Sequence, residues 1–242
     1  MTSTNVAGFT VTCEMSIIAS GVSLDTMVSC KAFTDWLGEI DRNQLNVRSV
    51  HIQSVNMFGE RVGFMMFRAD VVDRNDKPLP GVVFMRGGCV AILPVLVCNG
   101  KQYTVMTVQP RLPTGKFDFV EVPAGMLDGN GDFVGVAAKE IGEELKMKVG
   151  RDELIDMSAM AGHIRGFFPT PGGSDETIRV YCFVRQVSQE ELDELNGRLT
   201  GNLEEGEQIT LKIMPLKELW KIPDGKTIVA YTLFRELEEF IL

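Results

Sequence analysis

The chain has 242 residues, of which 45% are hydrophobic and 24% charged, proportions typical of a globular protein with a full core. Its formal net charge of −9 argues against broad binding to nucleic acid or to an anionic membrane surface. The five cysteines are odd in number and lack metal-ligand spacing, which indicates reduced core thiols. The sequence shows neither a secretory signal nor an apolar run of membrane-spanning length, so we expect a cytoplasmic protein.

The first third of the chain predicts a small β-rich subdomain. Residues 1–30 give no clear pattern, whereas residues 32–41 have the periodicity of a short amphipathic helix with Trp36 in its core face. Two β-rich runs follow at residues 47–57 and 61–72 and predict a hairpin. Residues 73–80 (DRNDKPLP) predict a linker, which divides the chain into domains 1–80 and 81–242. One hairpin and one helix make a small core, so we expect this segment to pack against a second subunit.

The remainder of the chain alternates strands and helices. Strand-like runs fall at residues 82–86, 90–97, 103–108, 116–122, 157–164, 178–187 and 208–214. Helices are expected at residues 134–145, from a capping box at Ser188 to about Leu195, at 216–220, and from an Asp224 cap to about Phe240. Asn99-Gly100 predicts a tight hairpin turn. This order indicates an α/β or α+β sandwich with a mixed sheet.

The helix expected at residues 134–145 carries the strongest chemical signal. Its apolar side chains have the spacing of one buried face: Val134, Ala137, Ala138, Ile141 and Leu145. The opposite face carries Glu140, Glu143 and Glu144, and like charges at this spacing destabilise a helix. A bound cation would relieve that repulsion, and oxygen-only ligands suit Mg²⁺ or Mn²⁺. A solvated acidic face is the alternative from this pattern alone.

The segment from Gly125 to Met147 resembles the Nudix box, G-x5-E-x7-R-E-U-x-E-E-x-G-U, where U is aliphatic. The glutamates, the first glycine and the aliphatic positions match. The sequence departs from the box at three positions, where Gly131 replaces Glu, Lys139 replaces Arg and Lys146 replaces Gly. The resemblance implies a Nudix-type α/β/α sandwich with a mixed sheet, joined to the small N-terminal β-rich subdomain. The three departures bear on rate rather than on metal binding.

Further segments are similar to the Nudix hydrolases that act on ADP-ribose and other nucleoside diphosphate sugars. They are VNMFGERVGF, GVVFMRGGCVAIL, VQPRLPTGKFDFVEVPAGMLDGNGDFVG and FPTPGGSDETI. The resemblance implies Mg²⁺-dependent or Mn²⁺-dependent hydrolysis of the pyrophosphate bond of a nucleotide sugar. It also implies a homodimer that pairs through the N-terminal segment. Two alternatives stay open: a non-catalytic nucleotide-sugar sensor, and a nucleoside triphosphate or CoA hydrolase.

The resemblance assigns roles to individual residues. The implied metal ligands are the carbonyl oxygen of Ala124 and the carboxylates of Glu140 and Glu144. The implied catalytic residues are Glu176, which deprotonates the attacking water, and Glu143, as a further ligand or a supporting group; Asp175 is the rival of Glu176. The implied substrate-binding residues are Arg111, at a phosphate, Arg86, reaching the nucleotide from the partner subunit, and Gly125. Arg111 in a surface ion pair and Arg86 as an ordinary strand-end residue are the non-functional alternatives.

Overall fold

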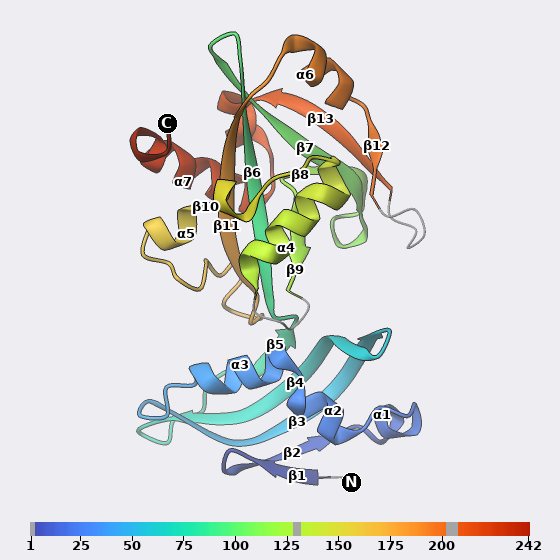
Figure 1. The fold of residues 1–242 in the computed structure, drawn as a ribbon. Coiled ribbons are helices and arrows are strands. Elements are labelled where there is room, and N and C mark those ends of the chain that lie inside the picture. Colours follow the sequence, from blue (N-terminus) through green and yellow to red (C-terminus); the bar gives the residue numbers. More distant parts are fainter. Residues whose placement is uncertain (1–2, 128–131, 202–207) are drawn as a thin grey trace. The chain divides into compact units, whose positions relative to one another are not determined.

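The computed structural model describes residues 3–127, 132–201 and 208–242. The chain divides into two compact units (Figure 1). The first unit contains Met1–Gly88 together with Thr170–Glu176, and the second contains Cys89–Pro169 and Thr177–Leu242. The segment 170–176 thus belongs to the first unit, although the residues before and after it in the sequence belong to the second.

The first unit is a five-stranded mixed sheet with helices on one face (Figure 1). Its elements are β1 (Ser3–Val6), β2 (Phe9–Cys13), α1 (Met15–Ala19), α2 (Leu24–Ser29), α3 (Lys31–Glu39), β3 (Leu45–Phe58), β4 (Arg61–Asp73) and β5 (Val82–Met85). The strand order is β1-β2-β3-β4-β5, with β2 and β3 parallel and the other neighbours antiparallel. The predicted hairpin and helix are both confirmed. The strand β5, within the range expected for the second domain, completes this sheet.

The first unit has a core of its own. Phe33 of α3 and Phe67 of β4 are fully buried, and Trp36 packs against both, with ring centroids 5.5 and 4.9 Å away. Residues before position 30 contribute to the same core, among them Val11 and Met27. The expectation of a core too small to stand alone is therefore wrong, because residues 1–30 form two strands and two helices that the sequence pattern did not reveal. The homodimer stays a prediction that rests on the resemblance.

The second unit is built on an eight-stranded sheet (Figure 1). Its strands are β6 (Gly88–Cys98), β7 (Lys101–Arg111), β8 (Lys116–Glu121), β9 (Ala124–Met126), β10 (Ile155–Asp156), β11 (Thr177–Gln186), β12 (Leu199–Thr200) and β13 (Ile209–Pro215). Its helices are α4 (Phe133–Glu140), α5 (Met157–Met160), α6 (Gln189–Leu195) and α7 (Gly225–Ile241), with short turns at Leu112–Thr114, Arg151–Glu153 and Leu216–Lys221. The strand order is β10-β11-β6-β7-β13-β12, while β8 pairs with β7 and β9 pairs with β6.

Two apolar cores, one on each face of this sheet, make the predicted α/β/α sandwich. Side chains of β6 alternate between them: Val90 and Ile92 belong to the core that includes residues of α4 and α6, whereas Ala91 and Leu93 belong to the core that includes residues of α5 and α7. The period-2 alternation of a strand produces this two-sided packing. The central strand is consequently buried on both faces.

Local capping and turn signals are borne out in the second unit. Asn99 and Gly100 both have positive φ (51° and 72°) between β6 and β7. Ser188 and Glu191 form the predicted capping box of α6, and Asp224 caps α7. The strand expected at residues 157–164 is wrong: Asp156 accepts a hydrogen bond from the Ala159 N–H (2.8 Å), and this cap begins the helix α5 instead.

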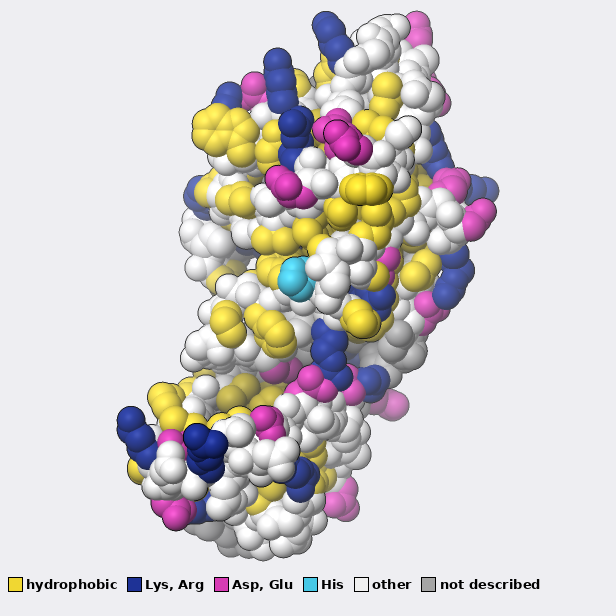
Figure 2. Space-filling model, turned by 90° about the vertical axis from the view of Figure 1, so that its left-hand side faces the viewer, with side chains coloured by type: hydrophobic (Ala, Val, Ile, Leu, Met, Phe, Trp, Pro, Cys, Tyr) yellow, Lys and Arg dark blue, Asp and Glu magenta, His cyan; other side chains and the backbone are white. Residues whose placement is uncertain are grey.

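Charges of both signs are interspersed with hydrophobic side chains on the face of the second unit that carries α5 and α7 (Figure 2). A broad positive field of the kind that attracts nucleic acid is absent from this face. None of the described helices combines the length and the hydropathy that a membrane crossing requires.

The helix α4 ends earlier than its sequence predicts. It continues from Glu140 into a single π-helical turn, Ile141–Leu145. A π turn holds one more residue than an α turn, so the side chains that follow are rotated about the axis. Glu144 is only 3% exposed and is buried like Ile141. Its place opposite the apolar face of the helix predicted an exposed side chain, and that expectation is wrong.

The π turn ends at Lys146, whose backbone is left-handed (φ 55°, ψ 30°). This is the position where the Nudix box has glycine. A left-handed conformation costs a residue with a Cβ atom about 1–2 kcal/mol relative to the right-handed one. The lysine that departs from the box therefore stands at a strained C-cap.

Replacing Lys146 with glycine should stabilise the protein. Relief of the left-handed strain outweighs the greater freedom of glycine in the unfolded chain, so Lys146→Gly should raise the free energy of unfolding by roughly 0.5–1 kcal/mol. Urea denaturation at constant m-value measures this change. The matched control is Lys148→Gly, at an exposed position outside the left-handed region, which should not stabilise. A lower stability of Lys146→Gly would contradict the argument.

Candidate active site

Glu140 lies directly against the backbone of Gly125. A Cβ atom on Gly125 would be 1.9 Å from Glu140 Oε1, so any other residue at this position would displace the carboxylate. Gly125 belongs to β9, which pairs with β6 in the register Ala91↔Ala124 and Val90↔Gly125. The structure thus brings together Ala124, Gly125 and Glu140, three of the residues that the sequence assigned to metal or substrate.

The other two glutamates of the box follow on the π turn. Glu144 is buried, and a buried carboxylate requires hydrogen-bond donors or a cation around it. Glu143 is half-exposed, and its Oε2 lies 3.7 Å from Lys139 Nζ. Lys139, the replacement for the arginine of the box, therefore keeps a charge contact with the acidic turn. Gly131, the third departure, lies outside the described residues.

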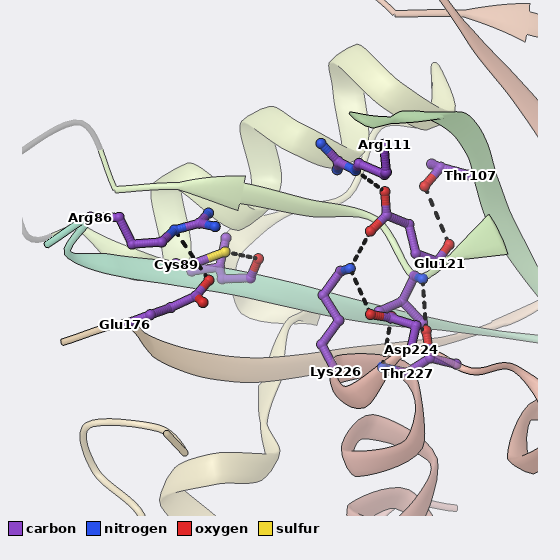
Figure 3. A network of polar contacts seen from close by, with 11 residues as sticks. Arg86, Cys89, Thr107, Arg111, Glu121, Glu176, Asp224, Lys226 and Thr227 are labelled. Atoms are coloured by element: carbon purple, nitrogen blue, oxygen red, sulfur yellow. Dashed lines mark hydrogen bonds and ion pairs between the residues drawn. The ribbon is translucent and has the colours of Figure 1, made fainter. Parts of the chain in front are cut away.

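Arg111 stands at the end of β7 in the same unit, held by a buried acid. Its Nε donates to Glu121 Oε1 at 2.6 Å, while its own side chain is 41% exposed. The second oxygen of Glu121 accepts from Lys226 (Figure 3). The ion pair of Arg111 is thus anchored in the interior and differs from the surface pair considered from the sequence.

Glu121 and Lys226 are polar residues that sequence analysis missed. Glu121 lies inside the apolar run FVEVP, and a carboxylate in such a run signals a buried, paired charge. Lys226 sits in the first turn of α7, where the helix dipole disfavours a cation, and that placement was a second available signal.

Arg86, Asp175 and Glu176 meet within the first unit. Arg86 Nε lies 3.3 Å from Glu176 Oε1. The guanidinium of Arg86 lies over the Phe64 ring, with Cζ 5.7 Å from the ring centroid. The side chain of Glu176 is 14% exposed. Arg86 was expected to reach a nucleotide in the partner subunit, and here it contacts a predicted catalytic residue of its own chain.

Asp175 has a different environment from Glu176. Its Oδ1 accepts the backbone N–H of Arg86 (2.8 Å), and its Oδ2 accepts that of Gly87 (3.1 Å). Gly87 has φ +76°, a conformation that favours glycine. Burial raises the pKa of Asp175, and the two backbone donors partly oppose that rise. Asp175 therefore fastens the segment 170–176 to the end of β5.

The oxygen atoms near Gly125 fit a divalent cation of the Mg²⁺ type. Among the described residues, no three acidic, histidine or cysteine side chains converge into a complete metal cage. Mg²⁺ seldom uses such a cage, because it is held by one or two carboxylates together with water and substrate phosphates. The approach of Glu140 to the Gly125 backbone and the all-oxygen character of Glu140, Glu144 and the Ala124 carbonyl match that pattern.

Comparison with known proteins places the chain in a family. No protein-family model matches it. It is 38% identical over 219 residues to a protein of Arabidopsis thaliana described as Nudix hydrolase 14, chloroplastic, covering 86% of this chain and 71% of that protein. A crystal structure of an ADP compounds hydrolase has a similar fold, with a TM-score of 0.56, 12% identity, and coverage of 81% of this chain and 96% of that chain. The relative from Arabidopsis is a Nudix hydrolase, and the similarity extends over most of both sequences. The chain therefore belongs to the Nudix hydrolases.

Proposed function

We propose that this protein hydrolyses the pyrophosphate bond of a nucleoside diphosphate linked to a sugar, such as ADP-ribose, ADP-glucose or UDP-glucose. The products would be a nucleoside monophosphate and a sugar phosphate. The observation that carries the proposal is the placement of the Glu140 carboxylate against Gly125, next to Ala124, with Glu144 on the following turn. The description of the structural neighbour as an ADP compounds hydrolase supports the nucleotide class.

The carboxylates of Glu140 and Glu144 and the carbonyl oxygen of Ala124 would hold the divalent cation, Mg²⁺ or Mn²⁺. Nudix hydrolases generally use divalent metals. Such a cation supplies charge neutralisation at the pyrophosphate and a lower pKa for a bound water. Glu143, restrained by Lys139, would be a further ligand or a supporting group.

Arg111 would bind a phosphate group of the substrate. Its guanidinium uses Nε for Glu121, which leaves Nη1 and Nη2 as the planar pair that matches two phosphate oxygens. A fixed cation at this point stabilises negative charge that develops as the pyrophosphate bond breaks. It also fixes the direction of the bond to be cleaved.

Glu176 is our candidate for the general base, in preference to Asp175. Both oxygens of Asp175 accept backbone N–H groups, so its lone pairs are engaged in holding the chain. Glu176 instead forms an ion pair with the side chain of Arg86, and substrate can replace a contact between two side chains without moving the backbone. A carboxylate in this role removes the proton of the attacking water.

Turnover should require Mg²⁺ or Mn²⁺. EDTA should abolish release of the nucleoside monophosphate, and excess Mg²⁺ should restore it. Glu144→Gln should lower kcat by about 100-fold or more, because it removes a ligand charge while keeping the side chain's volume. Glu153→Gln, at an exposed carboxylate paired with Arg185, is the matched control and should stay near full activity. Since Glu144 is buried, thermal unfolding must show that the variant is folded; full activity in EDTA would refute the metal site.

Substitutions of the two acids of the 170–176 segment, Asp175 and Glu176, should lower kcat to different extents. Glu176→Gln should lower kcat by about 10²–10⁴-fold with little change in KM, because it acts on the water and not on binding. Asp175→Asn keeps Oδ1, which accepts from the Arg86 N–H (2.8 Å) and lies 3.3 Å from the Gly87 nitrogen, so it should lower kcat much less. The reverse order of the two losses would assign the base to Asp175.

Substrate preference should favour nucleotide sugars. We expect kcat/KM for ADP-ribose, ADP-glucose or UDP-glucose to exceed that for dGTP and for CoA, because the sequence resembles the hydrolases that act on nucleoside diphosphate sugars. A preference for dGTP or CoA would favour the alternative hydrolase classes. Tight binding of ADP-ribose without turnover, in the presence of Mg²⁺, would favour the sensor.

A further inference from the structure

Glu121 is a carboxylate enclosed between two cations in the second unit. It is 2% exposed, its Oε1 accepts from Arg111 Nε at 2.6 Å, and its Oε2 accepts from Lys226 Nζ (Figure 3). A buried carboxylate with a cation at each oxygen holds its charge and its orientation firmly. Such a group is suited to fixing its neighbours in place.

The Lys226 side of this cluster is rigid. Asp224 caps α7 by accepting from the Thr227 N–H (3.1 Å) and the Thr227 hydroxyl (2.6 Å) on Oδ2, and its Oδ1 accepts from Lys226 Nζ (3.1 Å). The helix dipole disfavours a cation in this first turn, and the two carboxylates offset that effect. Glu121 is thereby tied to the start of a 17-residue helix that packs on the sheet.

The backbone at Glu121 is also fixed from both sides. Its carbonyl oxygen accepts from the Thr107 hydroxyl (3.2 Å), and the next N–H, of Val122, donates to Thr227 Oγ1 (3.0 Å). Ala124 follows two residues later. The side chain of Glu121 therefore projects from a strand end that cannot rotate freely.

The Arg111 side is the open end of the cluster. Among the described residues, the guanidinium makes its hydrogen bond through Nε to Glu121, and 41% of the side chain is exposed. A partly exposed arginine at the end of a strand samples several rotamers unless one nitrogen is restrained. The bond to Glu121 selects one of them and keeps both Nη groups available.

We propose that Glu121 is a positioning residue, which aligns the Arg111 guanidinium with the diphosphate group of the substrate and is itself aligned by Lys226 and Asp224. This inference rests on the proposed function, in which Arg111 contacts a phosphate. It assigns Glu121 no proton transfer and no contact with substrate. Its effect on the reaction passes entirely through Arg111.

A double-mutant cycle between Glu121 and Arg111 tests the inference. Glu121→Gln should lower kcat for ADP-ribose about 10–100-fold and change KM less than about threefold, because alignment matters most in the transition state. In an Arg111→Ala background the same substitution should cost less than about twofold, since the group that it aligns is gone. Glu218→Gln, which breaks an exposed Glu–Lys pair with Lys221, is the matched control and should leave kcat unchanged.

Folding must be separated from alignment. Glu121→Gln removes one of the two carboxylates that contact the largely buried Lys226 and leaves Asp224 as the other, so the double variant Glu121→Gln/Lys226→Met serves as a second variant in which this ammonium group is absent. Both variants should show the loss of kcat with the thermal transition retained. An equal loss with and without Arg111, or no loss at all, would overturn the inference.

Nuclear magnetic resonance distinguishes a failure of the proposed function from a failure of the role proposed for Glu121. The Nε–H resonance of Arg111, identified by its loss in Arg111→Ala, should shift when a non-hydrolysable methylene analogue of ADP-ribose is added with Mg²⁺. The shift should be lost in Glu121→Gln. If the unaltered chain binds the analogue but turns over no nucleotide sugar, the hydrolase proposal fails and this spectrum decides the role of Glu121. The same shift in the unaltered chain and in Glu121→Gln, or no shift in either, would reject the positioning role of Glu121.

Discussion

The contact between the Glu140 carboxylate and the Gly125 backbone sets the geometry of the second unit's site. Only a residue without a side chain lets an acid on α4 approach the strand β9 this closely. Because β9 pairs with the buried residues 89–91 of β6, the carboxylate is fixed relative to the centre of the sheet. The spacing between glycine and glutamate in the sequence is therefore a packing requirement as well as a chemical one.

Buried acids shape the rest of this unit. Glu144 and Glu121 are both nearly inaccessible, and burying a carboxylate is costly unless a partner compensates it. Glu121 is compensated by Arg111 and Lys226 within the described residues. Glu144 reaches its buried position through the π turn, an irregularity that recurs at functional sites. The turn ends at Lys146, which has a left-handed backbone (φ 55°) that a residue with a side chain does not favour.

In the first unit, the carboxylate of Asp175 holds two segments of backbone together. Asp175 joins the segment 170–176 to the end of β5 through the N–H groups of Arg86 and Gly87, which lie 89 and 88 positions earlier in the sequence. That attachment places Glu176 beside the Arg86 guanidinium. Two adjacent acids thus have separate tasks, one holding the chain and the other facing a side chain.

The sequence by itself determined the features whose causes are local. The Asn99-Gly100 turn, the Ser188 capping box and the Asp224 cap each depend on residues within four positions of one another, so the pattern suffices. The family spacing from Gly125 to Glu144 likewise located the acids. Tertiary structure decided the burial of Glu144, the pairing of Arg86 with Glu176 and the link from Arg111 through Glu121 to Lys226. These depend on an inserted residue in one helical turn and on contacts between distant strands and helices, and no periodicity along the chain encodes which charged side chains meet once the sheet has formed.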